Sequence, residues 1–153
     1  MRILSLSGGA TKFAGLFGAA SKVLDKGYKP DTILGISSGA LAALPLALSL
    51  FEEAKKLGTT LEHDSFFTKS PITKNGEISP NAVSRIITGR DSLGLQDAKR
   101  LLMSIVSEKD FVRYKQDLSL PDIYVGTVNF DTGLREVFRL RDFNYNDALD
   151  RIE

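Results

Sequence analysis

The chain has 153 residues, of which 42% are hydrophobic, enough apolar material for one core and too little for two. Its 20 Lys and Arg residues nearly balance its 19 Asp and Glu residues, so charge does not indicate nucleic acid or an anionic membrane as the main partner. The absence of cysteine excludes disulfides, thiol catalysis and thiolate-bound metals. We therefore expect one globular domain over residues 1–153.

The first forty residues predict a strand, a helix and a second strand. Residues 3–7 are a short apolar run typical of a buried strand. The helix that follows has apolar residues at helical spacing from Phe13 to Leu24, and Gly27 is placed to end it. Residues 32–34 predict the second strand. This order favours parallel pairing, which brings the loops after both strands to the sheet edge where α/β proteins bind ligands.

The middle of the chain predicts helices. The apolar run over residues 40–51 is too short to span a bilayer, for which about twenty residues are needed, and predicts a buried helix. We expect residues 52–56 to continue that helix. A further helix is expected between a Ser79 cap and a Gly89 stop, and another over residues 96–106.

The last thirty residues predict a hairpin and a helix. Residues 122–129 and 134–140 are strand-like, and a turn over residues 130–133 joins them. Residues 144–153 begin like a capped helix but have no stop signal. We interpret this as a sequence that was cut there.

The segment from Gly35 to Gly39 has the pattern of a nucleophile elbow, with Ser37 at its centre. A nucleophilic serine sits on a very tight turn, and glycine two positions to either side relieves the crowding there. The N-terminus of the following helix directs N–H groups and a positive dipole towards Ser37, which favours an oxyanion. The alternative reading of this pattern is an ordinary Gly/Ser turn between a strand and a helix.

A serine nucleophile needs a base, and the chain has a single histidine, His63. In α/β-hydrolases the histidine follows the acid late in the chain, whereas His63 follows Ser37 closely in a polar loop. We expect a solvated histidine there and a carboxylate as the base. His63 among scattered carboxylates does not suggest a metal site, and no cofactor is expected.

Three segments in order resemble the patatin-like phospholipase family. Residues 4–12 are similar to its glycine-rich oxyanion loop, residues 35–40 match its elbow, and residues 127–136 are similar to a strand–turn–strand segment that precedes its catalytic aspartate. The resemblance implies an α/β fold, a three-layer sandwich around a mostly parallel sheet. It also implies a serine acyl hydrolase that acts on phospholipid or other lipid esters with a Ser-Asp dyad.

The family's functional positions carry over residue by residue. The resemblance implies that Ser37 is the nucleophile and that Gly35 and Gly39 are the elbow glycines. The residues of the oxyanion site and its loop would be Gly8, Gly9, Ala10, Lys12 and Ser38. Two positions depart from the family pattern, because Ala10 replaces its third loop glycine and Phe13 its last. A lysine in the first turn of a helix is also commonly just solvated, which is the other reading of Lys12.

The family's Asp-Gly-Gly or Asp-Gly-Ala motif is missing. No aspartate after the elbow is followed by glycine, and this includes Asp117, Asp122, Asp131, Asp142, Asp147 and Asp150. Asp131 lies in the predicted hairpin turn, where aspartate is common because it bonds nearby backbone groups. We therefore expect the N-terminal part of a longer enzyme, without its base and inactive by itself.

Two other classes of function stay open. The Gly8-Gly9 turn before a helix would suit a non-catalytic α/β module that binds an anion or a nucleotide phosphate. A structural subunit completed by a partner is the third reading. For the leading reading we expect a lipid or acyl-ester substrate, no nucleic acid and a cytoplasmic location. Transient contact with a membrane surface and the oligomeric state are left open.

Overall fold

The computed structural model describes residues 1–8, 13–60, 73, 75–80, 84, 98–129 and 131–152. His63 lies outside these residues, as do Gly9, Ala10 and Lys12 of the predicted oxyanion loop. The helix expected between Ser79 and Gly89 also lies largely outside them.

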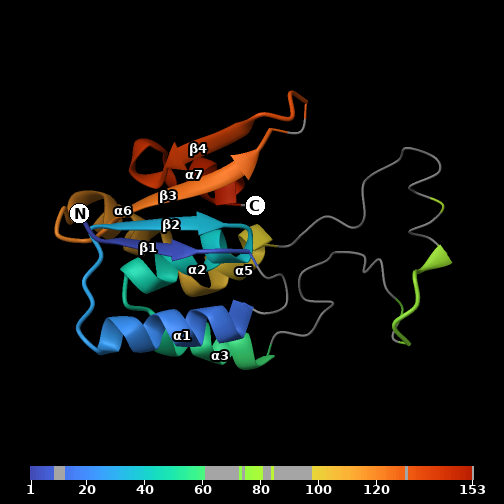
Figure 1. Cartoon of the computed structure of the whole chain (residues 1–153), viewed down its shortest axis with the longest axis horizontal. Helices are drawn as coiled ribbons and strands as arrows, with labels where there is room; N and C mark the ends of the chain where they lie inside the picture. Colours follow the sequence, from blue (N-terminus) through green and yellow to red (C-terminus); the bar gives the residue numbers. More distant parts are fainter. Residues whose placement is uncertain are drawn as a thin grey trace.

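A four-stranded mixed sheet forms the centre of the fold (Figure 1). Its strands are β1 (Ile3–Leu6), β2 (Thr32–Ile36), β3 (Asp122–Val128) and β4 (Arg135–Arg139), in that order across the sheet. The pairs β1–β2 and β2–β3 are parallel, whereas β3–β4 is antiparallel. The predicted strand–helix–strand unit, hairpin and mostly parallel sheet are therefore confirmed.

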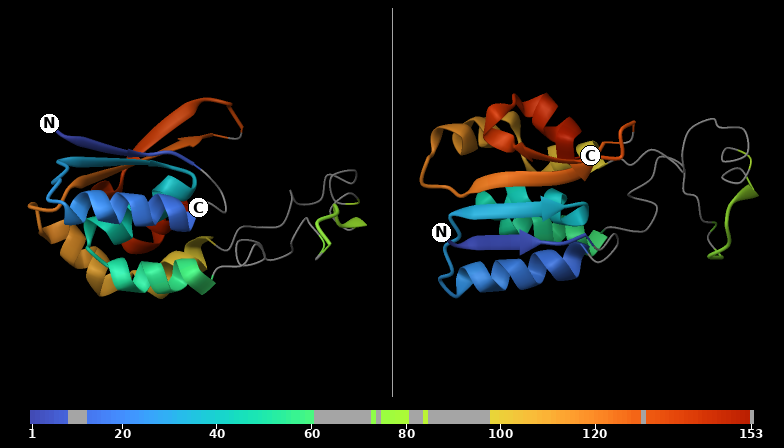
Figure 2. Two further views of the ribbon diagram at one scale, coloured as in Figure 1. Left: turned by 60° about the horizontal axis from the view of Figure 1, so that its bottom comes forward. Right: turned by 45° about the horizontal axis from the view of Figure 1, so that its top comes forward.

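The helices lie on one face of this sheet (Figure 2). They are α1 (Phe13–Asp25), α2 (Ser38–Ala47), α3 (Phe51–Thr60), α5 (Ala98–Ile105), α6 (Glu108–Gln116) and α7 (Tyr145–Ile152). Right-handed crossovers that step in one direction across a sheet keep their helices on the same face. The described residues thus form an α/β fold with the sheet and one helical layer of the expected sandwich.

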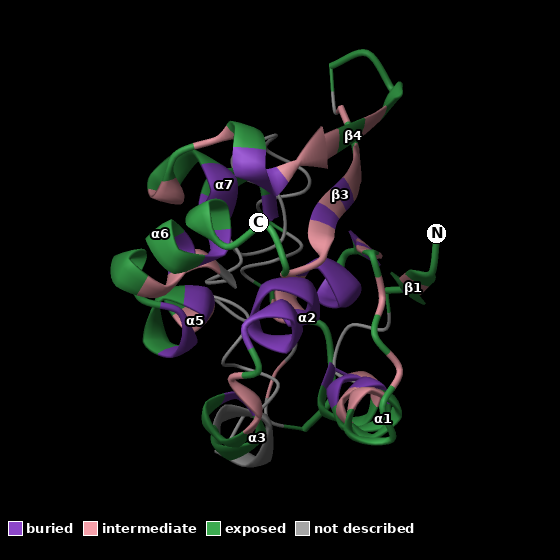
Figure 3. Cartoon of the chain, turned by 90° about the vertical axis from the view of Figure 1, so that its left-hand side faces the viewer, coloured by how far each residue is buried: buried purple, intermediate pink, exposed green. Residues whose placement is uncertain are grey.

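Helix α2 is the centre of the core, buried along nearly its whole length (Figure 3). It lies against β2 and also contacts β1, β3, α1, α3 and α5. A helix that is apolar all round is stable only when other elements surround it. Ala40, Ala42 and Ala43 of α2 are fully buried, as are Ile33 of β2 and Ile123 of β3.

The single helix expected over residues 40–56 is wrong, because the chain breaks between α2 and α3. Ser49 takes a left-handed conformation with φ 58°. Its N–H donates to the Leu46 carbonyl, and the Leu50 N–H donates to the Pro45 carbonyl. This is the Schellman ending of a helix. Glycine is the usual residue at the left-handed position of this motif. Because serine occupies it here, the sequence does not indicate that the helix ends.

Helix α6 was not predicted, although the sequence carries its start signal. The Ser107 hydroxyl accepts from the Asp110 N–H, and the Asp110 carboxylate accepts from the Ser107 N–H. This reciprocal pair is a capping box. At the predicted C-terminal helix, now α7, Asn144 caps the first turn by accepting from the Asp147 N–H.

A buried arginine fixes the connection from α6 into β3. Arg141, in the 3₁₀ turn η3 (Leu140–Asp142), donates to backbone carbonyls of Tyr114, Asp117 and Leu120. It also donates to the Asp122 carboxylate at 2.8 Å, and its guanidinium stacks over the Tyr114 ring. One side chain thus ties the end of β4 to the start of β3, the strand that lies next to β2.

Candidate active site

Ser37 is the single residue between strand β2 and helix α2. Its backbone angles are φ 55° and ψ −127°, a region that side-chain-bearing residues rarely occupy. Such a conformation costs on the order of 1–3 kcal/mol and is kept where the surroundings impose it, often at functional sites. The side chain of Ser37 is exposed, at the carboxyl edge of the parallel strands. The tight strand-to-helix turn expected from the sequence is present.

Both elbow glycines are needed, because a side chain at either position would collide with backbone atoms of another segment rather than with Ser37. A Cβ added to Gly35 would lie 2.7 Å from the Ala40 Cα and 2.7 Å from the Gly39 carbonyl oxygen. A Cβ on Gly39 would lie 2.0 Å from the carbonyl oxygen of Leu6, at the end of β1. The first glycine therefore lets α2 start directly over β2, and the second lets it pass against β1.

The loop that leaves β1 lies directly beside the serine. A Cβ added to Gly8 would be 2.9 Å from the Ser37 Cβ and 3.4 Å from its Oγ. The structure thus brings together two predicted site residues that are far apart in sequence. Gly9, Ala10 and Lys12 follow Gly8 outside the described residues, so their role at an oxyanion site stays a prediction.

The start of α2 makes the surroundings of Ser37 favourable for negative charge. Ser38 is the first residue of the helix and only 3% exposed. The Ala40 N–H donates to the Ser37 carbonyl at 2.8 Å, which fixes the first turn. Helix N-termini carry unpaired N–H groups and about half a positive charge. The arrangement can stabilise an oxyanion that forms near the Ser37 hydroxyl.

No candidate base contacts Ser37 within the described part of the chain, where its hydroxyl has no hydrogen bond to a carboxylate or histidine. Asp131 is exposed in the turn after β3, and its N–H donates to the Asn129 Oδ1. It therefore has the turn conformation that its sequence predicted. Asn129 also donates to the Glu136 carboxylate at 2.9 Å, so Glu136 is hydrogen-bonded to Asn129.

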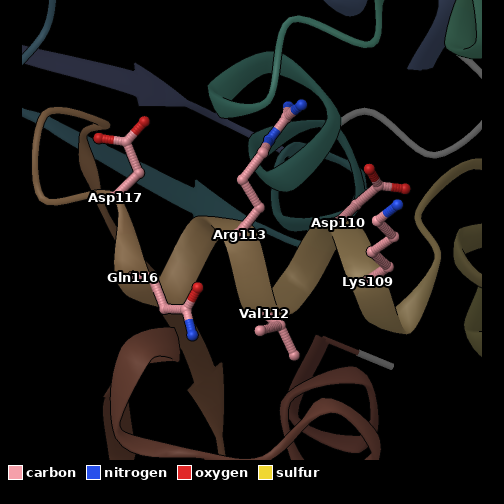
Figure 4. A pocket seen from close by; sticks show the side chains of 6 residues that line it. All are labelled: Lys109, Asp110, Val112, Arg113, Gln116 and Asp117. Carbon is pink, nitrogen blue, oxygen red and sulfur yellow. The ribbon is translucent and has the colours of Figure 1, made fainter.

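A depression of about 750 Å³ lies on α6 (Figure 4). Its lining side chains do not converge, since Val112 and Gln116 point to the opposite side of the helix from Arg113 and Asp117. Arg113 donates to the Leu48 carbonyl, and hydrogen bonding from Ser107 lowers the pKa of Asp110. These groups serve helix packing and capping, so we assign no catalysis to this hollow.

Neither a metal cluster nor a membrane span is found in the described part of the chain. Over these ranges, no three His, Asp or Glu side chains lie close enough together to hold a metal ion. None of the helices there is long and apolar enough to cross a membrane.

The fold and the strained serine define the class: an α/β protein with a strand–serine–helix elbow at the carboxyl edge of its parallel strands. A family model described as patatin-like phospholipase matches residues 4–151. The chain therefore belongs to the patatin-like phospholipase family, as its motifs predicted.

A relative is found in Aspergillus oryzae, a patatin-like phospholipase domain-containing protein with 48% identity over 54 residues. The matched segment is 35% of this chain and 8% of the relative. This chain thus matches only a small share of that protein's length. No solved structure matches the chain.

Proposed function

We propose that this chain carries the nucleophile of a lipid acyl hydrolase, and that the nucleophile is Ser37. The observation that carries the proposal is the strained backbone of an exposed serine between β2 and α2 in a member of this family. Residues 1–153 would then form one patatin-like domain. The substrate is a phospholipid or another lipid ester.

In the proposed reaction, the Ser37 Oγ attacks the carbonyl carbon of the ester and gives its proton to a base. The carbonyl oxygen becomes an oxyanion, stabilised by N–H groups of Ser38, Gly9 and Ala10, with Lys12 supporting the loop. Collapse of this intermediate breaks the bond to the alcohol, which leaves with the proton from the base. Water then attacks the acyl-serine by the same route and releases the fatty acid.

We propose that the base is an aspartate that the 153-residue chain does not contain, forming a Ser-Asp dyad with Ser37. The support is that no aspartate of the 153-residue chain is followed by glycine, as the family's Asp-Gly-Gly or Asp-Gly-Ala motif requires. Residues of a catalytic unit act together, so loss of one lowers the rate by several orders of magnitude. The 153-residue chain alone should hydrolyse esters at a rate near background.

The test compares p-nitrophenyl butyrate hydrolysis by the 153-residue chain and by the complete protein encoded by its reading frame. The complete protein should show turnover that Ser37→Ala abolishes and that Ser5→Ala, a change at an exposed serine of β1, leaves intact. A folded complete protein without turnover would contradict the hydrolase. Ser37-dependent turnover by the 153-residue chain would contradict the location of the base.

The same samples test the anion-binding alternative. A protein stabilised against heat by inorganic phosphate, with no esterase turnover, would favour a non-catalytic module that binds anions at the Gly8-Gly9 turn. The hydrolase proposal expects turnover in the complete protein whether or not phosphate binds.

A further inference from the structure

Ser37 lies between two neighbouring strands, and the residue at its level on each side follows from the strand register. On the β1 side the neighbour is Gly8, where an added Cβ would lie 2.9 Å from the Ser37 Cβ. On the β3 side, Ile36 pairs with Gly126 in a parallel ladder, so the next residue, Thr127, comes level with Ser37. Strands β2 and β3 run side by side in the same direction (Figure 2), and neighbouring strands are about 4.8 Å apart. Thr127 is therefore the residue of β3 that flanks the proposed nucleophile.

The Thr127 side chain projects from the face of the sheet that α2 covers. Side chains alternate between the two faces along a strand, so Thr127 shares a face with Val125. Val125 is buried and pairs with Gly35, whose added Cβ would meet the Ala40 Cα of α2. Thr127 itself is half-buried, two residues further along the strand. Its side chain thus stands where the helix-covered face ends and Ser37 is exposed.

The polar side chains next to Thr127 on this face bind each other. Asn129, two residues further along the chain, donates to the Glu136 carboxylate, and its Oδ1 accepts from N–H groups of the following turn. Glu136 pairs with Thr127 across the hairpin but is hydrogen-bonded to Asn129. Within the part of the chain that the structure describes, the Thr127 hydroxyl makes no hydrogen bond. Because branching at Cβ restricts its rotamers, this hydroxyl is held in place at little cost in entropy.

A hydroxyl at this position suits the alcohol side of an ester. In the proposed reaction, the loop after Gly8 and the start of α2 bind the carbonyl oxygen, and Gly8 lies on the β1 side of Ser37. The carbon bound to the Ser37 Oγ carries two further substituents, the acyl chain and the alcohol oxygen. Thr127 lies on the β3 side, opposite the Gly8 loop. Of the two substituents, only the alcohol oxygen can accept a hydrogen bond from a hydroxyl.

We propose that Thr127 is a further catalytic residue, whose hydroxyl donates a hydrogen bond to the alcohol oxygen of the ester as that oxygen leaves. The inference rests on the proposed function, since it concerns the same reaction. In acylation, the bond between the Ser37 Oγ and the ester carbon forms, the bond from that carbon to the alcohol oxygen breaks, and the Ser37 proton passes through the base to the alcohol. Thr127 keeps its own proton and stabilises the negative charge that develops on the leaving oxygen. Its effect is therefore largest for aliphatic alcohols, whose oxygens are strong bases.

The test measures kcat/KM of the complete protein for two esters of the same acid, ethyl butyrate and p-nitrophenyl butyrate. This ratio reports acylation, the step in which the alcohol leaves, and does not depend on the later hydrolysis of the acyl-serine. Thr127→Val removes the hydroxyl but keeps a branched side chain that suits a strand. It should lower kcat/KM about tenfold for ethyl butyrate and less than about twofold for p-nitrophenyl butyrate, whose weakly basic alcohol leaves without such help.

Further variants separate the hydroxyl from the fold. Thr127→Ser keeps a hydroxyl and should retain most of the rate with ethyl butyrate, whereas Thr127→Ala lacks it and should show the same dependence on the alcohol as Thr127→Val. The matched control is Thr32→Val, at another half-buried threonine of the sheet, which begins β2 at the edge opposite to Ser37. It should leave the rates with both esters unchanged. Circular dichroism and thermal midpoints verify the fold of each variant.

The outcomes distinguish the role of Thr127 from the proposed function. Equal losses with both esters in Thr127→Val would overturn the inference, because neither a structural change nor a contact with the acyl chain depends on the alcohol. An unchanged kcat/KM for ethyl butyrate would overturn it too. Both results leave the proposed function intact as long as Ser37→Ala abolishes turnover. A folded complete protein without turnover of either ester contradicts the proposed function, and the role of Thr127 with it.

Discussion

Gly39 of helix α2 packs directly against Leu6 of strand β1, since a Cβ on Gly39 would lie 2.0 Å from the Leu6 carbonyl oxygen. The helix that follows Ser37 is thereby pressed against the strand that leads into the Gly8 loop. This approach places the nucleophile candidate and the loop of the proposed oxyanion site side by side.

Gly39→Ala should lower the free energy of unfolding by about 3 kcal/mol, because a backbone carbonyl and a buried helix must move apart. Gly15→Ala is the matched control. Gly15 is an exposed position inside α1 with no atom within 4 Å of an added Cβ, so alanine there should stabilise the chain by about 0.5–1 kcal/mol. Urea unfolding followed by circular dichroism measures both, and equal effects would refute the packing argument.

Gly8→Ala should impair catalysis by the complete protein more than its stability. The added Cβ would lie 2.9 Å from the Ser37 Cβ, so the loop or the serine must shift. Displacement of a catalytic group by about 1 Å can lower the rate about 10²-fold. We expect a loss of this size in kcat for p-nitrophenyl butyrate, with Gly18→Ala, which meets no atom within 4 Å, as the control. An unchanged kcat would argue against the proximity of this loop to the reacting serine.

Ser49→Gly should stabilise the chain by up to about 1 kcal/mol. Ser49 holds the left-handed position after α2 with φ 58°, where glycine avoids the steric penalty of a side chain. Ser37→Gly should relieve similar strain at φ 55° but abolish the proposed esterase activity. Thermal unfolding of the two variants checks this contrast. A destabilised Ser49→Gly protein would show that the serine makes a compensating contact.

Alkaline pH should destabilise the fold through Tyr114. Burial is the main cause that raises the pKa of this phenol from 10.0 to about 12. The unfolded chain therefore loses this proton at a lower pH than the folded chain. The stabilising contribution is complete below pH 10 and is lost as the pH rises towards 12. Over that window the free energy of unfolding should fall by about 2–3 kcal/mol from this group.

Tyr114→Phe checks the assignment by urea unfolding at a series of alkaline pH values. The variant should lose about 1–2 kcal/mol near neutral pH, because the Ile123 N–H loses its acceptor, but its stability should then fall less steeply. Tyr28→Phe removes a phenol that donates to the Ile3 carbonyl at the surface and should keep the steep fall. An equally steep fall in Tyr114→Phe would exclude Tyr114 as its source.

Local patterns predicted much of this fold. The apolar spacing of α1, the hairpin of β3 and β4, and the strand and helix around Ser37 depend on periodicity and on glycines within a few residues. The break at Ser49 could not be predicted, because serine replaces the glycine that usually marks it. The start of helix α6 could have been predicted from the capping box of Ser107 and Asp110. A search for apolar periodicity alone does not detect such a signal.

The geometry of the site depends on contacts that sequence spacing does not show. The approaches of Gly39 to Leu6 and of Gly8 to Ser37 join segments about thirty residues apart and follow from the parallel pairing of β1 with β2.

The central claim is that Ser37 is a nucleophile, and covalent labelling tests it most directly. The complete protein is treated with a fluorophosphonate and its peptides are measured by mass spectrometry. We predict one added phosphonyl group, on the peptide that contains Ser37, and none in Ser37→Ala. A folded complete protein that stays unlabelled, or that is labelled at another serine, would contradict the account.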